Sequence, residues 1–205
     1  RAGGEIQSLQ FVGPDGGKRF LTDGRVKGCY FSIGNPTEAP ALCVCEGFAT
    51  GASIYEATDL PVAVAFNAGN LLPVAETMRS VFPALQILIC ADDDYLTEGN
   101  TGIAKANEAA RKVGGRVAVP QFGENRPEKA TDFNDLALYL GGEAVKACID
   151  GAMSDQNAGD EATPSPDDEK TPDRTETDCE WGEPLPIPSG LLPVESFDPL
   201  LLPVS

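Results

Sequence analysis

The sequence predicts an α/β fold with a mostly parallel sheet and helices on both of its faces. Two apolar runs, 42–45 and 87–91, end abruptly in acidic residues. Continuous runs of this kind are typical of strands that are buried on both faces, as in a parallel sheet. Predicted strands also alternate with predicted helices along the chain, which favours parallel strands joined by helical crossovers.

The expected elements can be placed in order from their apolar patterns and the residues that interrupt them. They are strand 42–45, helix 50–58, strand 62–66, helix 71–81, strand 86–91, helix 102–113, strand 116–119 and helix 133–140. Pro73 is tolerated in the first turn of its helix, and Gly114 and Gly115 end helix 102–113. A plain Rossmann-like domain is the alternative fold, but no Gly-x-Gly-x-x-Gly follows the first strand.

The segment before this core has a different pattern. Residues 6–12 partly alternate between apolar and polar, and a strong turn follows at 14–17. Two further short strands are expected at 18–21 and 28–33. We therefore expect residues 1–36 to form a small antiparallel β segment.

Positive charge is concentrated in this segment of an otherwise acidic chain, which has a net charge of −17. The residues concerned are Lys18, Arg19, Arg25 and Lys27. They could contact nucleic acid or nucleotide phosphates. The alternative is ordinary solvated charge, because charged residues are mostly exposed in any protein.

The strand at 86–91 is followed by three successive carboxylates. Asp92 and Asp94 are two residues apart, so on an extended chain their side chains point to the same side. They would lie at the carboxyl end of a parallel strand, where open α/β sheets bind ligands. Two oxygen ligands of this kind suit Mg²⁺, whereas Asp93 points away and supports the site or the next helix. The simpler interpretation is an acidic loop after a strand.

Glu46 lies in the same position after strand 42–45. It faces the start of the next helix, where Thr50 lies and where anions are favoured. Gly47 and Gly51 would let the backbone approach a ligand closely.

A third acidic group surrounds the start of helix 133–140. Thr131 or Asp132 could cap that helix. Asp132 could equally support a metal site, and Asp132 and Asp135 together could orient the residues that bind the ion.

These three groups together resemble the Toprim domain. The closest likeness is to the Toprim domains of plasmid- and phage-type primases and primase-helicases, carried by Cys-Glu-Gly-Phe-Ala-Thr-Gly-Ala-Ser-Ile at 45–54 and Ala-Val-Ala-Phe-Asn-Ala-Gly-Asn-Leu at 63–71. The resemblance covers about 28–149 and implies a Toprim-like, Rossmann-like catalytic domain over 37–152. The chain departs from cellular primases, which usually carry an acid shortly after the glycine, where this chain has Ala49, Thr50 and Gly51.

The resemblance implies RNA primer synthesis on a single-stranded DNA template from nucleoside triphosphates, with Mg²⁺ or Mn²⁺ as cofactor. Asp92 and Asp94 would hold the metal, and Glu46 would act as general acid/base or as a further ligand. Lys105 could reach phosphates, although a solvated helix face explains it equally well. A Mg²⁺-dependent Toprim nuclease and a non-catalytic metal- or nucleotide-binding module of a replication protein are the alternatives.

Composition excludes several other classes. The chain has no histidine, which rules out a Ser-His-Asp or Cys-His mechanism within it. Its six cysteines lack zinc-type spacing and are expected to be mostly buried as small hydrophobic residues. No apolar run is long enough to cross a bilayer and no signal peptide is recognised, so we expect a cytoplasmic protein without a membrane partner.

The last fifty residues change character. Residues 153–183 are rich in Asp, Glu, Pro, Thr and Ser, which predicts a disordered acidic linker. Residues 184–205 resemble the start of a helicase-like region, so a helicase-like domain is expected as a partner in cis or in trans. The chain begins at Arg1, and we expect it to be a piece of a larger primase of a mobile element.

Overall fold

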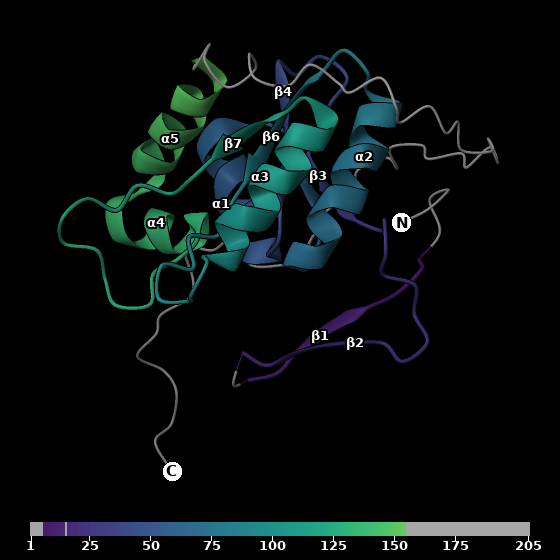
Figure 1. Cartoon of the computed structure of the whole chain (residues 1–205), viewed down its shortest axis with the longest axis horizontal. Helices are drawn as coiled ribbons and strands as arrows, with labels where there is room; N and C mark the ends of the chain where they lie inside the picture. The colour runs from purple at the N-terminus through teal and green to yellow at the C-terminus, as the bar shows by residue number, and fades with distance from the viewer. Residues whose placement is uncertain (1–5, 15, 155–205) are drawn as a thin grey trace, which may run out of the picture.

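A five-stranded sheet forms the centre of the computed structural model, which describes residues 6–14 and 16–154 (Figure 1). The strands are β3 (Phe31–Ile33), β4 (Ala41–Cys45), β5 (Val62–Val64), β6 (Gln86–Cys90) and β7 (Arg116–Ala118). Their order across the sheet is β3-β5-β4-β6-β7. The last four strands along the chain are mutually parallel, and β3 runs antiparallel to β5 at one edge. The predicted α/β fold with a mostly parallel sheet is confirmed.

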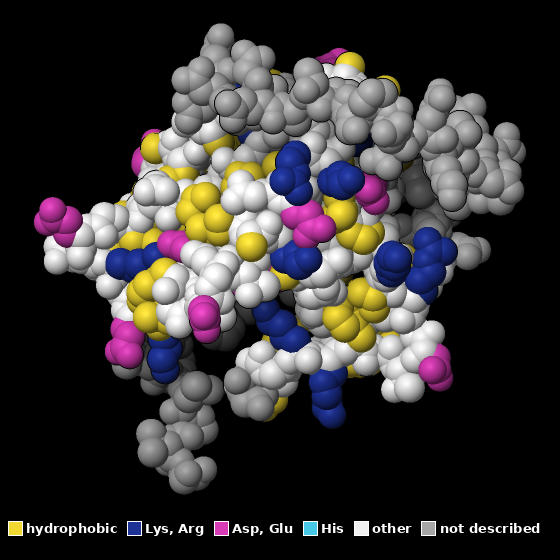
Figure 2. Space-filling model, in the orientation of Figure 1, with side chains coloured by type: hydrophobic (Ala, Val, Ile, Leu, Met, Phe, Trp, Pro, Cys, Tyr) yellow, Lys and Arg dark blue, Asp and Glu magenta, His cyan; other side chains and the backbone are white. Residues whose placement is uncertain are grey.

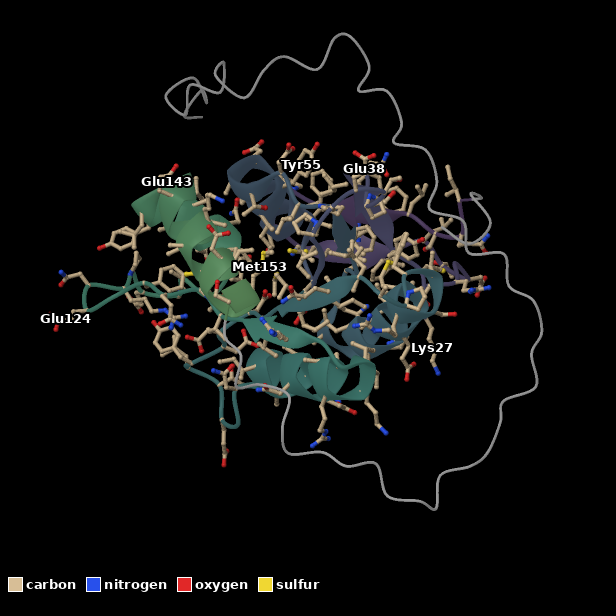
Figure 3. All side chains as sticks on the ribbon, turned by 90° about the horizontal axis from the view of Figure 1, so that it is seen from above. Lys27, Glu38, Tyr55, Glu124, Glu143 and Met153 are labelled. Carbon is tan, nitrogen blue, oxygen red and sulfur yellow. The ribbon has the colours of Figure 1, made fainter. Side chains whose placement is uncertain are left out.

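Helices cover both faces of this sheet, as the view from above shows (Figure 3). On one side lie α1 (Phe48–Thr58), α4 (Phe133–Leu140) and α5 (Gly142–Ser154); on the other lie α2 (Leu71–Val81) and α3 (Thr101–Val113). Every residue of β4 is buried, and its side chains alternate between two hydrophobic clusters. Leu42 and Val44 pack against the α2 and α3 side, whereas Ala41, Cys43 and Cys45 pack against the α1, α4 and α5 side.

The N-terminal segment is only partly as expected. β1 (Gln10–Val12) and β2 (Lys18–Phe20) form an antiparallel hairpin that lies apart from the main sheet (Figure 1). The third strand expected in this small sheet, within 28–33, instead joins the main sheet as β3. The sequence identified the strand but carried no information about its partner.

A buried asparagine connects the main sheet to the chain that leads out of the hairpin. Asn70 ends a short 3₁₀ turn, η1 (Ala68–Asn70), directly before α2. Its side-chain oxygen accepts a hydrogen bond from the Gly28 N–H (2.8 Å), and its side-chain nitrogen donates to the carbonyls of Cys29 and Ala65 (both 2.9 Å). Every polar group of this side chain is therefore satisfied inside the protein.

Most element boundaries lie within two residues of those expected. The strand expected at 62–66 ends at Val64, because Phe66 takes a left-handed backbone conformation (φ 70°). Helix α5 was not predicted, although Val145 and Ile149 form a buried i, i+4 pair on it. Met153 and Ser154, expected to begin the linker, belong to its last turn. The remaining linker and the helicase-like segment lie outside the described residues.

The cysteines behave as small apolar residues. Among the described residues, Cys29, Cys43, Cys45 and Cys90 are buried, Cys148 is partly buried, and these five are free thiols. Burial raises the pKa of the Cys45 thiol well above its usual value, so this group is an unreactive thiol. Within residues 6–14 and 16–154, no helix has the length and apolar character needed to span a membrane.

Asn70→Ala should lower the free energy of unfolding by about 2–4 kcal/mol. The substitution leaves the Gly28 N–H and two carbonyls without their partner, and buried polar groups without partners are costly. Urea unfolding followed by circular dichroism measures the change. The matched control is Asn107→Ala on the exposed face of α3, which should be neutral or slightly stabilising. Equal effects of the two substitutions would contradict this role of Asn70.

Candidate active site at the carboxyl ends of the central strands

The two strands that precede the predicted acids are neighbours in the sheet. β4 and β6 pair in parallel, with Cys43 opposite Leu88 and Val44 opposite Ile89. The segments that follow them therefore leave the sheet at the same edge. This brings Glu46, after β4, close to Asp92 and Asp94, after β6, although more than forty residues separate them in sequence.

The pKa shifts of these carboxyl groups show that the groups lie close to one another. Burial raises the pKa of Glu46 to about 7, and the carboxylate of Asp94 adds to the effect. A hydrogen bond from the backbone of Ala68 and the charge of Lys18 oppose it.

Asp92 is perturbed further. Burial raises its pKa to about 8, with additional contributions from the negative charges of Glu46, Asp132 and Asp94. Lys18 again opposes the shift. Four carboxyl groups thus share one partly desolvated region, and a bound cation would favour their charged forms.

The donor set fits a hard divalent cation such as Mg²⁺. Asp92 Oδ1 is buried and has no hydrogen-bond partner among the described residues, as expected of an oxygen that is available to a ligand. As the described side chains are arranged, no three His, Cys, Asp or Glu residues are grouped closely enough to hold an ion. Mg²⁺ does not need such a group, since one or two carboxylates with water and phosphate oxygens usually hold it.

Asp94 is positioned by the first turn of α3. Its Oδ2 accepts a hydrogen bond from the Gly102 N–H (3.1 Å). A Cβ atom at Gly102 would lie 2.1 Å from the Asp92 carbonyl oxygen and 3.1 Å from Asp94 Oδ2. Only glycine lets the helix approach the acidic segment this closely, and the sequence analysis missed this residue.

Asp93 points to different partners. It accepts hydrogen bonds from the Asn100 side chain (2.6 Å) and from Arg126, with which it forms an ion pair. Its backbone N–H donates to the Thr131 carbonyl (2.7 Å), which joins the acidic segment to the segment before α4. Asp93 is thus a supporting residue of the acidic segment.

Arg126 is the main residue that the sequence analysis did not find. Besides Asp93, it donates to the carbonyls of Asp93 (2.9 Å) and Ala130 (2.7 Å). Its guanidinium carbon lies 3.8 Å from the centroid of the Tyr95 ring and 4.6 Å from that of Phe122. One side chain therefore holds together the segments that carry Asp92 and Asp132.

Asp132 has two structural roles beside its proximity to Asp92. It is the N-cap of α4, where it forms a reciprocal capping box with Asp135: its Oδ1 accepts from the Asp135 N–H (2.8 Å). Asp135 Oδ2 accepts from the Thr131 N–H (2.8 Å). The second carboxylate oxygen of Asp132 accepts from the Thr50 hydroxyl (2.8 Å), which links α4 to α1.

Glycines bring α1 close to the sheet. A Cβ atom at Gly51 would lie 2.9 Å from Val64 Cγ2, so this turn of α1 packs directly on β5. At Gly47, the N-cap of α1, a Cβ would lie 3.0 Å from the Thr50 hydroxyl oxygen. The short loop after β4 therefore holds Glu46 between the sheet and the helix start.

The predicted basic residues are not all near the acids. Lys18 is near enough to lower the pKa values of Glu46 and Asp92, whereas Lys105 lies on α3 and pairs with Glu108 (2.8 Å). Arg19 lies beside Lys18 in β2, and Arg25 and Lys27 lie in the connection between the hairpin and β3. Figure 3 shows Lys27 at the outer edge of the molecule.

Comparison with known proteins supports the same region. The sequence model of the Toprim domain matches residues 41–143, about half of the chain. Two similar proteins of Escherichia coli, each called DNA primase TraC, are 41% identical over 133 residues and 38% identical over 128 residues. The alignments cover 60% and 59% of this chain but 12% and 9% of those proteins. The chain thus spans about a tenth of the length of these relatives.

Arg126→Ala should lower the free energy of unfolding by about 2–4 kcal/mol, because Asp93 loses its partly buried ion pair and two carbonyls lose their donor. Arg126→Lys should recover only part of this loss, since lysine lacks the forked donors. Urea unfolding measures both variants, with Arg111→Ala on the exposed face of α3 as control. An Arg126→Ala variant as stable as the control would show that this contact network is unimportant.

The metal-free protein should lose stability as the pH rises from about 5 to about 8. Asp92 and Glu46 bind protons more tightly when folded, with pKa values of about 8 and 7, than when unfolded. Over that range the folded state holds more protons, so raising the pH favours unfolding. We expect the melting temperature to fall by several degrees, and Mg²⁺ at pH 8 to restore most of it.

Thermal melts of wild type and Asp92→Asn, with EDTA or with Mg²⁺, measure this effect. The variant should show a much smaller pH dependence and a smaller response to Mg²⁺. A wild-type melting temperature that does not change across this pH range would mean that the acids are not buried together.

Proposed function

This chain belongs to the Toprim domain family, and we propose that its carboxylate cluster catalyses Mg²⁺-dependent nucleotidyl transfer for RNA primer synthesis on single-stranded DNA. The observation that carries the proposal is the grouping of Glu46, Asp92 and Asp94 at one edge of the sheet, with a buried Asp92 oxygen that has no partner among the described residues. The likeness to two proteins called DNA primase supports primer synthesis over other reactions of the family.

Asp92 and Asp94 are the residues that would hold Mg²⁺ or Mn²⁺. When bound, the ion offsets the negative charge of the nucleoside triphosphate and of the displaced pyrophosphate. Asp94 keeps its orientation through the Gly102 N–H, and Asp92 is directed into the cluster by the close packing of α3 against its carbonyl.

Glu46 is the proton acceptor in this proposal. A pKa of about 7 is suited to taking a proton from the attacking 3′ hydroxyl at neutral pH, because the group is ionised in part and binds a proton readily. A bound cation nearby would lower this pKa and increase the ionised fraction. Asp93, Asp132 and Asp135 act indirectly, by fixing the segments on which the reacting groups lie.

In this proposal, binding of the template depends mostly on other domains. A net charge of −17 is unfavourable for binding a polyanion, so most of the affinity for the template comes from other domains. A helicase-like domain in cis or in trans is the expected partner, and the reaction takes place in the cytoplasm.

A paired assay tests the proposal directly. One reaction holds single-stranded DNA with labelled nucleoside triphosphates, and the other holds end-labelled DNA alone, both with Mg²⁺ or Mn²⁺. Wild type should make labelled oligoribonucleotides, and Glu46→Gln and Asp92→Asn should reduce the yield by at least about a hundredfold. Glu143→Gln, an exposed acid on α5, is the matched control and should remain active.

The two reactions separate the alternatives. Shortened DNA in place of oligoribonucleotides would assign the chain to the Toprim nucleases. If neither product forms, calorimetric titration of the same proteins with Mg²⁺ shows whether they bind the metal. Absence of both products together with absence of Mg²⁺ binding would contradict the proposal.

A further inference from the structure

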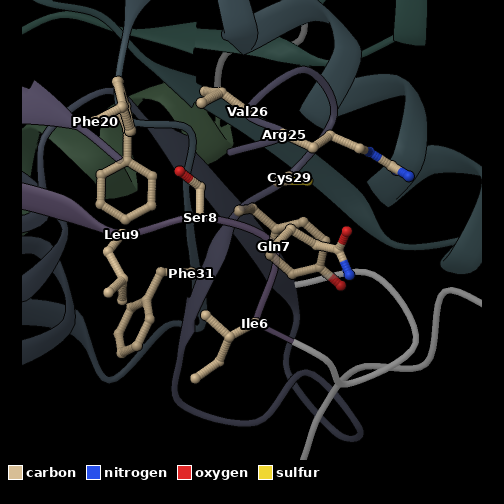
Figure 4. A pocket seen from close by; sticks show the side chains of 11 residues that line it. Ile6, Gln7, Ser8, Leu9, Phe20, Arg25, Val26, Cys29 and Phe31 are labelled. Atoms are coloured by element: carbon tan, nitrogen blue, oxygen red, sulfur yellow. The ribbon is translucent and has the colours of Figure 1, made fainter. Parts of the chain in front are cut away.

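An apolar pocket lies between the N-terminal segment and the edge of the main sheet. Its volume is about 250 Å³, slightly below the usual range for small-molecule sites. Leu9, Phe20 and Phe31 line one side, and Val26 and the aliphatic part of Arg25 line the other (Figure 4). The guanidinium end of Arg25 points outward (Figure 4). None of these residues belongs to the carboxylate cluster.

Two segments connect the pocket to the cluster. Phe20 lies two residues after Lys18, whose charge lowers the pKa values of Glu46 and Asp92. Phe66, another lining residue, donates its backbone N–H to the Glu46 carbonyl (2.7 Å). A ligand in the pocket would therefore contact a segment that is hydrogen-bonded to the backbone of Glu46.

Phe66 is held in an unfavourable backbone conformation. Its φ of 70° lies in the left-handed region, which is sterically unfavourable for a side chain of this size. The Phe66 ring packs edge-to-face on Phe20, with centroids 6.1 Å apart and planes at 89°. Strain of this kind is concentrated at functional sites, where it places a side chain that a relaxed backbone would direct elsewhere.

The positive charge around this apolar pocket favours the binding of a polyanion that carries apolar groups. Lys18, Arg19, Arg25 and Lys27 lie on or directly after the hairpin. Figure 2 shows Lys and Arg side chains on the side of the molecule where the hairpin lies, with hydrophobic side chains between them. The Ser8 hydroxyl lines the pocket and is buried without a hydrogen-bond partner among the described residues. It could bond to the polar edge of a planar ring.

We propose that this pocket binds one unstacked base of the single-stranded template, next to the carboxylate cluster. Aromatic side chains beside a basic track are the usual means of binding single strands, because every base has a stacking face. The inference rests on the proposed function for the nature of the strand. It adds a base-binding subsite, formed by Phe20, Phe31, Phe66 and Ser8, to the catalytic site.

Fluorescence anisotropy with two labelled oligomers of equal length tests this subsite. One is oligothymidylate, and the other consists of abasic sugar-phosphate units with the same charge. Wild type should bind the first about tenfold more tightly than the second, the ratio expected for one stacked base. Phe31→Ala should abolish the difference by weakening only oligothymidylate binding. Arg25→Gln should weaken the binding of both oligomers.

Two further variants show whether a loss of binding arises from the lost ring or from a folding defect. Phe11→Ala removes an exposed hairpin ring that does not line the pocket and should behave as wild type. Phe20→Leu keeps the apolar volume but removes a stacking face, and should lose the preference for bases. The proposal is overturned if wild type binds the two oligomers equally, or binds neither. It is also overturned if Phe31→Ala has no more effect than Phe11→Ala.

The same measurement on Glu46→Gln separates the two proposals. This variant should keep the preference for oligothymidylate, because Glu46 does not line the pocket. Base-dependent binding with neither primer synthesis nor Mg²⁺ binding would refute nucleotidyl transfer and leave the subsite intact. Primer synthesis without base-dependent binding would refute the subsite alone.

Discussion

Burial of several carboxyl groups at one edge of the sheet is the constraint on which the rest of this structure depends. Glu46, Asp92, Asp94 and Asp132 are close enough for mutual repulsion, and burial adds to the cost of charging Glu46 and Asp92. A protein does not place acids in this way for stability, since each ionised group lowers the stability of the metal-free fold at neutral pH. A cation bound there would offset this cost.

The supporting contacts form a continuous frame around the acids. Arg126 fixes Asp93, and the backbone of Asp93 in turn bonds to Thr131. The capping box of α4 and the Thr50 hydroxyl then fix Asp132. These contacts satisfy the side chains of Asp93 and Asp132, whereas Asp92 Oδ1 has no partner among the described residues. The contrast distinguishes these structural contacts from the Asp92 oxygen, which is available to a ligand.

The apolar pattern of the sequence was sufficient to predict most of the regular strands and helices. It predicted the central strands, four helices and the juxtaposition of Glu46 with Asp92, because parallel strands place their carboxyl ends at one edge. It could not assign β3 to the main sheet, since alternation identifies a strand without its partner. Arg126 and Gly102 were missed because each acts through long-range contacts, and the pocket was missed because two distant segments form it.

The central claim is that Asp92 and Glu46 are buried together as the core of a cation site. Carbon-13 NMR of the side-chain carboxyl groups, titrated by pH with and without Mg²⁺, measures this directly. Without metal, Asp92 and Glu46 should titrate with pKa values of about 8 and 7. With Mg²⁺, both should titrate several pH units lower, near or below the ordinary values of about 4. Ordinary titration of both groups without metal, and no change on adding Mg²⁺, would contradict the account.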